Sequence, residues 1–378
     1  MDAYRYALEL FAEDGRPLGQ VSVDPDWEPA LEWAAFAAVR RGLLPALAAA
    51  PPGDVEPLWD AARGRPFVAG FRVRVAGAEL GAATDLPVTY FWPQAQRAAA
   101  AFVESGGLQA GAPFYFRVHA FAARAAAAAN DDGAFSVDEV RPALPIDEQS
   151  LAPLVGASMR SGAEAETDEI PVFVPRPVLN EVRARAREHP DVEIGGILVG
   201  ALHRDPDLPE IFLEVTAQIP ARHALSHATK VTFTAETWAA ADAAIALRRR
   251  GEIMCGWYHS HPDWCRRCPI ENRRRCTVSS DFFSADDVHL HRVCFARAYH
   301  VALLISDNIN SGMTWSLYAW RLGLVTRRGF HIIEDDMESM ACPTQSEWAA
   351  GPEREIGSLC ARHGHHEWGP VKCSKGRG

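Results

Sequence analysis

The sequence predicts a two-part protein, with an α+β domain followed by an α/β domain, and three observations support this. The chain has 378 residues, 48% hydrophobic and 23% charged, a composition typical of globular proteins and a length that suits two or three domains. Residues 142–170 lose hydrophobic periodicity and gain proline, serine, glycine and acidic residues, as linkers do. From Pro171 onward, strand-like and helix-like segments alternate.

The first domain, residues 1–141, has a mixed pattern. Alternating apolar residues at Tyr4–Phe11 and Gly19–Val23 flank a turn and predict a hairpin. The remaining elements are expected as helices at 27–41 and 93–107, and as strands at 67–75, 88–92 and 114–121. We find no catalytic motif in this part of the sequence.

The second domain, residues 171–336, carries the stronger patterns. Helices are expected at 177–188 and 234–250, the latter amphipathic and with Thr234 at its N-cap. The remaining elements are expected as strands at 193–200, 211–219, 253–261, 300–306 and 314–322, and as a short helix at 284–292. The tail, 337–378, becomes irregular.

Charge and cysteine usage restrict the classes of function. The chain has no apolar run long enough to span a membrane and no signal peptide pattern, so we expect a cytoplasmic protein without a membrane partner. A formal net charge of -11 disfavours nucleic-acid binding, which needs a basic surface. All eight cysteines lie in the last third, where short spacing without an export signal favours metal ligands over disulfides.

A catalytic metal site is indicated by "HSHP" and "SADD". Side chains two apart in a strand point the same way, so His259 and His261 share a face, and Pro262 ends the strand. A carboxylate in the first turn of the helix after Ser284 would complete a His-His-Asp site with one open position, as catalytic zinc requires. Taken singly, the histidines are explained as surface or core residues, and "SADD" by N-capping with early acidic residues on the helix dipole.

Together with Glu193 in "VEIGGILVG", these motifs resemble the JAMM, or MPN-plus (JAB domain), zinc metalloprotease family. That family has a glutamate that opens a glycine-containing strand, then His-x-His-Pro, then Ser-x-x-Asp. The resemblance covers Pro171 to Leu324. It implies a cytidine-deaminase-like domain with a mixed sheet and a bacterial-type, deubiquitinase-like isopeptidase.

The resemblance also implies the residue roles. His259, His261 and Asp287 would bind the catalytic zinc, Glu193 would be the general base on the zinc-bound water, and Ser284 would steady the oxyanion. The substrates would be conjugates or precursors of a ubiquitin-like protein, cut after its C-terminal glycine. The first domain would then recruit the substrate or proteins of the conjugation pathway.

One departure from the family is the Cys-rich insertion, residues 263–283, between the proline and the serine. It leaves Asp281 or Asp286 as other candidates for the carboxylate ligand, although only Ser284 with Asp287 keeps the family spacing.

The insertion itself predicts a second, structural zinc bound by Cys265, Cys268, Cys276 and Cys294. Cys255 or a tail residue is another candidate for the fourth ligand. Unligated thiols, or a Cys265 that reaches the catalytic zinc, also fit the pattern. In the tail, a further zinc clip or a frayed end would explain Cys360, His363, His365, His366 and Cys373.

Two other functions are compatible with these residues. A metalloprotease of this kind could process another peptide, such as a sulfur-carrier protein. A non-catalytic scaffold could use the first domain for binding, but Glu193 would then have no task.

Overall fold

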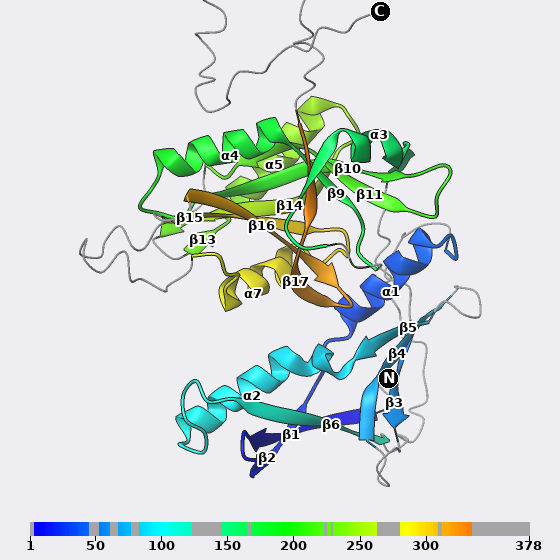
Figure 1. The fold of residues 1–378 in the computed structure, drawn as a ribbon, viewed down its shortest axis with the longest axis vertical. Helices are drawn as coiled ribbons and strands as arrows, with labels where there is room; N and C mark the ends of the chain where they lie inside the picture. The colour runs from blue at the N-terminus through cyan, green and yellow to red at the C-terminus, as the bar shows by residue number, and fades with distance from the viewer. Residues whose placement is uncertain are drawn as a thin grey trace, which may run out of the picture. The chain divides into compact units, whose positions relative to one another are not determined.

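The computed structural model describes residues 4–44, 53–60, 67–76, 83–122, 145–164, 166, 168–222, 225–227, 230–262, 280–308 and 312–334. These residues form a mixed α/β fold that consists mostly of sheet (Figure 1), and they belong to one compact unit that extends to Asp335. None of the helices within these ranges combines the length and apolarity that crossing a membrane needs.

Two three-stranded antiparallel sheets and two helices make up the first part of the chain. One sheet has the order β2-β1-β6 and the other the order β3-β4-β5. The strands are β1 (Tyr4–Ala12), β2 (Pro17–Val23), β3 (Gly53–Asp60), β4 (Phe67–Val75), β5 (Thr84–Pro87) and β6 (Phe114–Ala122). The helices are α1 (Glu28–Arg40) and α2 (Trp92–Glu104). The hairpin and both helices predicted for this region are confirmed, whereas β3 and β5 were not expected.

The strand predicted at 88–92 is wrong. Residues Val88–Phe91 form a 3-10 helix, η1, and Trp92 begins α2. A proline in the first turn favours the start of a helix, and Pro93 stands there. Tyr90 is buried, and its hydroxyl donates to the backbone oxygen of Asp26 at 2.5 Å, so tertiary packing overrides the strand propensity of this segment.

A ten-stranded mixed sheet forms the rest of the described chain, with the order β17-β16-β15-β14-β10-β11-β9-β18-β8 and with β7 paired to one end of β10. Parallel pairs are β14–β15, β9–β11, β9–β18 and β7–β10, and the other neighbours are antiparallel. Its strands are β7 (Ile146–Glu148), β8 (Ser158–Ser161), β9 (Val172–Pro175), β10 (Gly195–Arg204), β11 (Ile211–Pro220), β14 (Ile253–His261), β15 (Val301–Asn308), β16 (Gly312–Arg321), β17 (Leu324–Arg328) and β18 (Phe330–Ile333). A separate hairpin consists of β12 (Leu225–His227) and β13 (Lys230–Thr232).

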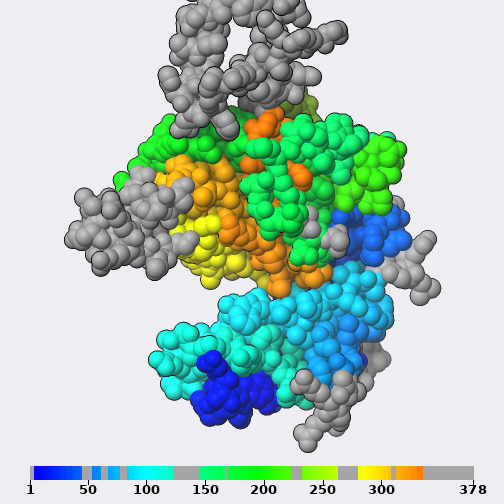
Figure 2. All heavy atoms as spheres, viewed as in Figure 1, coloured from blue at the N-terminus to red at the C-terminus, as the bar shows by residue number. Residues whose placement is uncertain are grey.

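The segment 142–170, expected as a linker, is part of this sheet. β7 pairs with Leu202–Arg204 of β10, a short helix α3 (Leu151–Gly156) follows, and β8 pairs with β18. Figure 2 shows these green residues against the orange β16–β18 region. Strands of three or four residues are too short to show a period of two, which is why the sequence concealed them. The boundaries expected at 141 and 336 lie outside the described residues.

The sheet is covered on both faces. Along β15, Val301, Leu303 and Ile305 join the hydrophobic cluster that contains α4 (Arg176–Glu188). Ala302 and Leu304 join a second cluster with side chains of α5 (Ala235–Arg248) and α7 (Ala285–Cys294). Because side chains alternate along a strand, α4 covers one face and α5 and α7 cover the other.

Helix α1 connects the first part of the chain to the large sheet. Glu32 is buried, and its Oε1 lies 3.1 Å from Nε of Arg297, which precedes β15. Arg40 pairs with Glu210 at 2.7 Å, near the β10–β11 turn. Buried side chains of the two parts belong to one hydrophobic cluster, so the parts are joined by packing as well as by the chain.

Candidate metal centre

The end of β14 positions the two histidines. In this strand Trp257 packs in the cluster with α5 and α7, and His259 and His261 follow at spacings of two, on the same face. Their Nε2 atoms are 3.2 Å apart, and the residues are 0% and 3% exposed. The strand therefore presents two buried imidazoles to the N-terminus of α7.

The first turn of α7 brings a carboxylate to them. Ser284 is the N-cap, and it forms a capping box with Asp287: the Asp287 N–H donates to Ser284 Oγ at 3.1 Å, and the Ser284 N–H donates to Asp287 Oδ2 at 2.8 Å. The other oxygen, Oδ1, lies 3.5 Å from His259 Nε2. The capping oxygen Oδ2 also lies 3.9 Å from His261 Nε2, so one carboxylate caps the helix and faces both histidines.

The donor atoms of His259, His261 and Asp287 lie within 4.8 Å of one another. Two donors bound to one tetrahedral zinc at its usual bond lengths are about 3.3 Å apart; the separations found here are 3.2 Å between the histidines, 3.5 Å from His259 to Asp287 and 3.9 Å from His261 to Asp287. Two imidazoles and a carboxylate are also a donor set that zinc prefers. These residues therefore fit a zinc ion.

The other candidate aspartates have different positions. Asp281 accepts a hydrogen bond from Ser316 Oγ at 2.5 Å and pairs with Arg327 at 2.8 Å. Asp286 is exposed. Within the described ranges, Asp287 is the aspartate that groups with both histidines, so the geometry favours it over the two alternatives.

The two imidazoles are oriented differently. His261 Nδ1 lies 2.7 Å from the backbone oxygen of Ser280, which also accepts from Ser306 Oγ at 2.9 Å. His259 Nδ1 is buried and has no hydrogen-bond partner among the described residues. The His259 ring instead stacks on Trp257, with centroids 4.6 Å apart and an interplanar angle of 15°.

Glu193, two residues before β10, reaches the same place. Gly195 pairs with His259 across the β10–β14 ladder, and continuing this antiparallel register by two residues places Glu193 opposite His261. Its Oε1 lies 3.8 Å from His261 Nε2. Glu193 is 3% exposed, and burial, with a contribution from the charge of Asp287, raises its pKa to about 8.

The surroundings of His261 and Asp287 favour the protonation states in which these side chains bind metal ions. Burial, reinforced by His259, lowers the pKa of His261 to about 4. Burial alone would raise the pKa of Asp287, but hydrogen bonds from His259 and Ser284 outweigh it and hold that pKa at about 2. A neutral imidazole and an ionised carboxylate are the ligand states, so neither group needs to lose a proton near pH 7.

Two residues of this site were missed from the sequence. Trp257 stacks on His259, and its Nε1–H donates to Nδ1 of the fully buried His291 at 3.0 Å. His291 lies four residues after Asp287 in α7. That spacing puts both on one helix face, which is the signal that could have identified His291.

The cysteine cluster lies mostly outside the described residues, which include neither Cys265, Cys268 nor Cys276. Cys294 is exposed at the end of α7, and Cys255 is fully buried in β14. The structural zinc therefore stays a prediction. The cysteines and histidines of the tail lie outside the described ranges as well.

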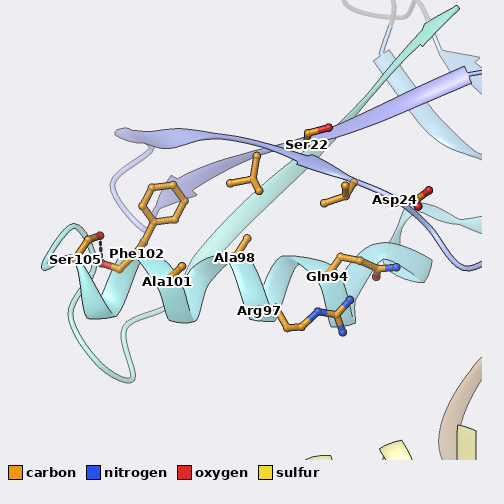
Figure 3. Close-up of a pocket in the computed structure, with 10 residues that line it drawn as sticks. Ser22, Asp24, Gln94, Arg97, Ala98, Ala101, Phe102 and Ser105 are labelled. Carbon is orange, nitrogen blue, oxygen red and sulfur yellow. Dashed lines mark hydrogen bonds between the residues drawn. The ribbon is translucent and has the colours of Figure 1, made fainter. Parts of the chain in front are cut away.

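A separate groove of about 600 Å³ lies between β2 and α2 in the first part of the chain (Figure 3). Apolar side chains line much of it, among them Val21, Ala98 and Phe102, with Asp24 and Arg97 at its polar parts. No candidate site residue lines this groove, so it is distinct from the histidine cluster.

Comparisons with known proteins identify no family. No protein-family profile matches the sequence, and no curated protein matches it. One solved structure with partial likeness is the solution structure of protein DSY2949 from Desulfitobacterium hafniense, at 21% identity over 43% of this chain and 92% of that chain, with a TM-score of 0.27. A likeness this weak carries no argument about fold or function.

Proposed function

We propose that this chain is a zinc metallopeptidase of the JAMM/MPN-plus type that cleaves after the C-terminal glycine of a ubiquitin-like modifier. The observation that carries the proposal is the meeting of the buried Glu193, His259 and His261 with Asp287, whose side chain is 14% exposed, in one cluster. These residues come from the segment just before β10, the end of β14 and the first turn of α7. A packing requirement alone would not gather two carboxylates and two imidazoles away from water, because buried charges are costly.

The three ligands would be His259, His261 and Asp287. When bound, zinc would supply Lewis-acid polarisation of the scissile carbonyl and acidify the attacking water. Glu193 Oε1 lies 3.8 Å from His261 Nε2. In its ionised form Glu193 would take a proton from the water and pass it to the leaving amine. The raised pKa of Glu193 is typical of groups that exchange protons near neutral pH.

Ser284 would act on the oxyanion that forms when water adds to the carbonyl. Its Oγ accepts the Asp287 N–H, which leaves the hydroxyl proton available to donate. The capping box fixes the side chain beside Asp287, and a donor held in place before the reaction stabilises developing charge most effectively.

The substrate class rests on the resemblance to the family. A ubiquitin-like protein, as a conjugate or as an extended precursor, would supply the scissile bond, and the first part of the chain would recruit the substrate or a conjugation-pathway protein. A sulfur-carrier precursor would use the same chemistry. A non-catalytic scaffold is disfavoured because a buried carboxylate at position 193, 3.8 Å from His261, adds cost without a role in such a protein.

The decisive experiment compares wild type with Glu193→Gln. Ubiquitin-like proteins from the same genome, fused through their C-terminal glycine to a reporter, are incubated with each, and products are identified by mass spectrometry. We expect the wild type to cut after the glycine and Glu193→Gln to be slower by about 10²–10⁴-fold. Zinc content measured on both proteins should be equal, because Glu193 is not a ligand in this proposal.

The outcomes separate the alternatives. Equal cleavage by both proteins would remove Glu193 from the mechanism. If neither protein cleaves any fusion while both bind zinc through the histidines, the scaffold function takes precedence. Cleavage of a sulfur-carrier fusion alone would identify the substrate as that class.

A structural zinc in the insertion is a second, separate proposal for the metal content. Elemental analysis of the double variant Cys265→Ser, Cys268→Ser should show one zinc fewer than the wild type. An unchanged zinc count would exclude these thiols as ligands.

A further inference from the structure

The indole of Trp257 lies between the candidate ligand His259 and the buried His291. On one side it stacks on the imidazole of His259, with centroids 4.6 Å apart. At its edge, Nε1–H donates to His291 Nδ1 at 3.0 Å. Trp257 and His291 are 1% and 0% exposed. Since an indole has a single polar hydrogen, this hydrogen bond fixes how the ring is rotated within the core.

Among the described residues, His259 has no contact of the kind that usually supports a zinc-binding histidine. Such residues almost always donate the second ring N–H to a carboxylate, a carbonyl or water, which sets the orientation of the ring. His261 has this contact through the Ser280 backbone oxygen. For His259 Nδ1 the described residues offer no hydrogen-bond partner, so ring contacts must orient it. The stack on Trp257, at 4.6 Å, is closer than the contacts with His261 at 4.9 Å and Phe283 at 5.8 Å.

Helix α7 therefore acts on the site through two side chains. Asp287, in its first turn, faces His259 directly, with Oδ1 3.5 Å from Nε2. His291, one turn later, holds the indole that stacks on the same histidine. Residues four apart lie on one face of a helix, so a single element sets both one ligand and the orientation of another.

We propose that His291 is a positioning residue, which holds Trp257 so that Trp257 holds His259 in the orientation for metal binding. This inference rests on the proposed zinc site. It requires His291 Nδ1 to be an acceptor, and therefore the ring to be neutral with its proton on Nε2. Burial, with a smaller effect of His300, lowers the pKa of His291 to about 3, which agrees with a neutral ring near pH 7.

The test uses the full-length protein and Zn²⁺ and Co²⁺ as probes. Zinc affinity is measured by competition with a chromophoric chelator, and the ligand field from the visible bands of the Co²⁺-loaded protein. A His261→Ala variant identifies which binding event belongs to this site. We expect His291→Leu to weaken zinc binding by about tenfold or more and to shift the Co²⁺ bands, because the indole N–H then has no acceptor.

The conservative variant His291→Asn should rescue both readouts. The asparagine Oδ1 is bonded to Cγ, as the histidine Nδ1 is, so it can accept from Trp257. A merely structural role for His291 would not distinguish the two variants through the cobalt spectrum. Should His291→Leu fail to fold, Trp257→Phe, which keeps an aromatic ring and removes the N–H donor, gives the same comparison.

His203 provides a matched control. It is also a buried histidine stacked on an aromatic ring, that of Phe212 at 5.1 Å, but it lies near the far end of β10 from Glu193. His203→Leu is expected to leave zinc affinity unchanged.

A folded His291→Leu protein with wild-type zinc affinity and an unchanged Co²⁺ spectrum would overturn the inference alone, and cleavage by the wild type would still support the proposed function. A wild type that binds no zinc through His261 would overturn both.

Discussion

At the scale of single residues, the carboxylate of Asp287 gives the sharpest test of the proposed zinc site. Asp287→Asn keeps an oxygen that can accept the Ser284 N–H, so the capping box should persist, but it removes the negative charge beside His259. We expect zinc affinity to fall by more than tenfold, since zinc favours ionised carboxylate ligands (about tenfold per 1.4 kcal/mol lost), as measured by chelator competition.

Asp286→Asn is the control for that substitution, because Asp286 is the exposed neighbour in the same turn. It changes the same charge next to the same helix terminus without touching the histidine cluster. Equal losses for the two variants would show that the effect comes from net charge and not from ligation.

Because the side chain of His300 is buried, we expect the free energy of unfolding to depend on pH. Burial lowers its pKa to about 4, below the value of about 6.5 for an exposed histidine. The unfolded chain therefore binds the proton first as pH falls. The stabilisation is fully present above about pH 6.5 and is lost as pH falls toward 4, at up to about 1.4 kcal/mol per pH unit.

His300→Asn should remove this contribution while its side-chain oxygen replaces Nδ1, which accepts from the Arg297 N–H at 3.2 Å. The measurement is urea unfolding at several pH values with a chelator present. The prediction fails if wild type and variant lose stability in parallel between pH 6.5 and 5.

The sequence revealed site residues that are close in the chain and concealed those that meet only in the fold. The spacings of His259 with His261 and of Ser284 with Asp287 are local, so strand and helix periods are sufficient to group each pair. Glu193 was assigned to the site through the family resemblance, because the sequences of β10 and β14 do not specify how the two strands are aligned. Trp257 and His291 form their contact across separate elements, and no spacing rule joins them.

At the scale of elements, β14 depends on a glycine. A Cβ on Gly256 would lie 2.0 Å from the backbone oxygen of Val301 in the neighbouring strand β15. Gly256→Ala must therefore move one strand away from the other. We expect destabilisation of about 1–3 kcal/mol or more in chemical unfolding, together with weaker zinc binding, because the displaced strand carries both histidines.

Gly156→Ala is the matched control at the end of α3, where a new Cβ meets nothing within 4 Å. Its stability should stay within about 0.5 kcal/mol of wild type. A Gly256→Ala protein as stable as this control would show that β14 and β15 can separate without cost.

Element prediction succeeded where a pattern had room to repeat. Helix α4 was expected at 177–188 and is found at Arg176–Glu188, since it buries an apolar stripe over several turns. Strand β4 was expected and found at residues 67–75. The strands that were not expected include the short β5, β7 and β8, in which few residues show no period. They also include the eight-residue β3, which contains Pro57, and a proline weakens a strand pattern. The strand expected at 88–92 was wrong because Val88–Phe91 form a 3-10 turn next to a proline.

At the scale of the whole molecule, the pair of Glu32 and Arg297 joins α1 to the large sheet. Their side chains are 4% and 16% exposed, and the Ala298 N–H donates to the same glutamate oxygen at 3.4 Å. Removing one partner of a buried ion pair costs about 3–5 kcal/mol. Glu32→Ala should therefore lower the free energy of unfolding by that order, measured by denaturant titration.

Two further variants separate burial from charge. Asp85→Ala breaks the exposed pair with Arg72, whose side chains are 51% and 38% exposed, and should cost about 1 kcal/mol or less. The double variant Glu32→Leu, Arg297→Met should recover part of the loss, because no buried charge is then left over. A Glu32→Ala protein no less stable than Asp85→Ala would contradict a joining role for the pair.

The position of β18 has a consequence for biosynthesis. This strand, Phe330–Ile333, lies between β9 and β8. Strands β8 and β9 therefore cannot complete their pairing until β18 has been translated. Helix α1 also forms part of its packing only late in translation, because Glu32 pairs with Arg297 and Phe36 packs near Tyr299. Contacts of such large sequence separation form slowly and leave strand edges exposed. A nascent chain that has not reached residue 330 should therefore engage holding chaperones, and folding should be completed late in translation.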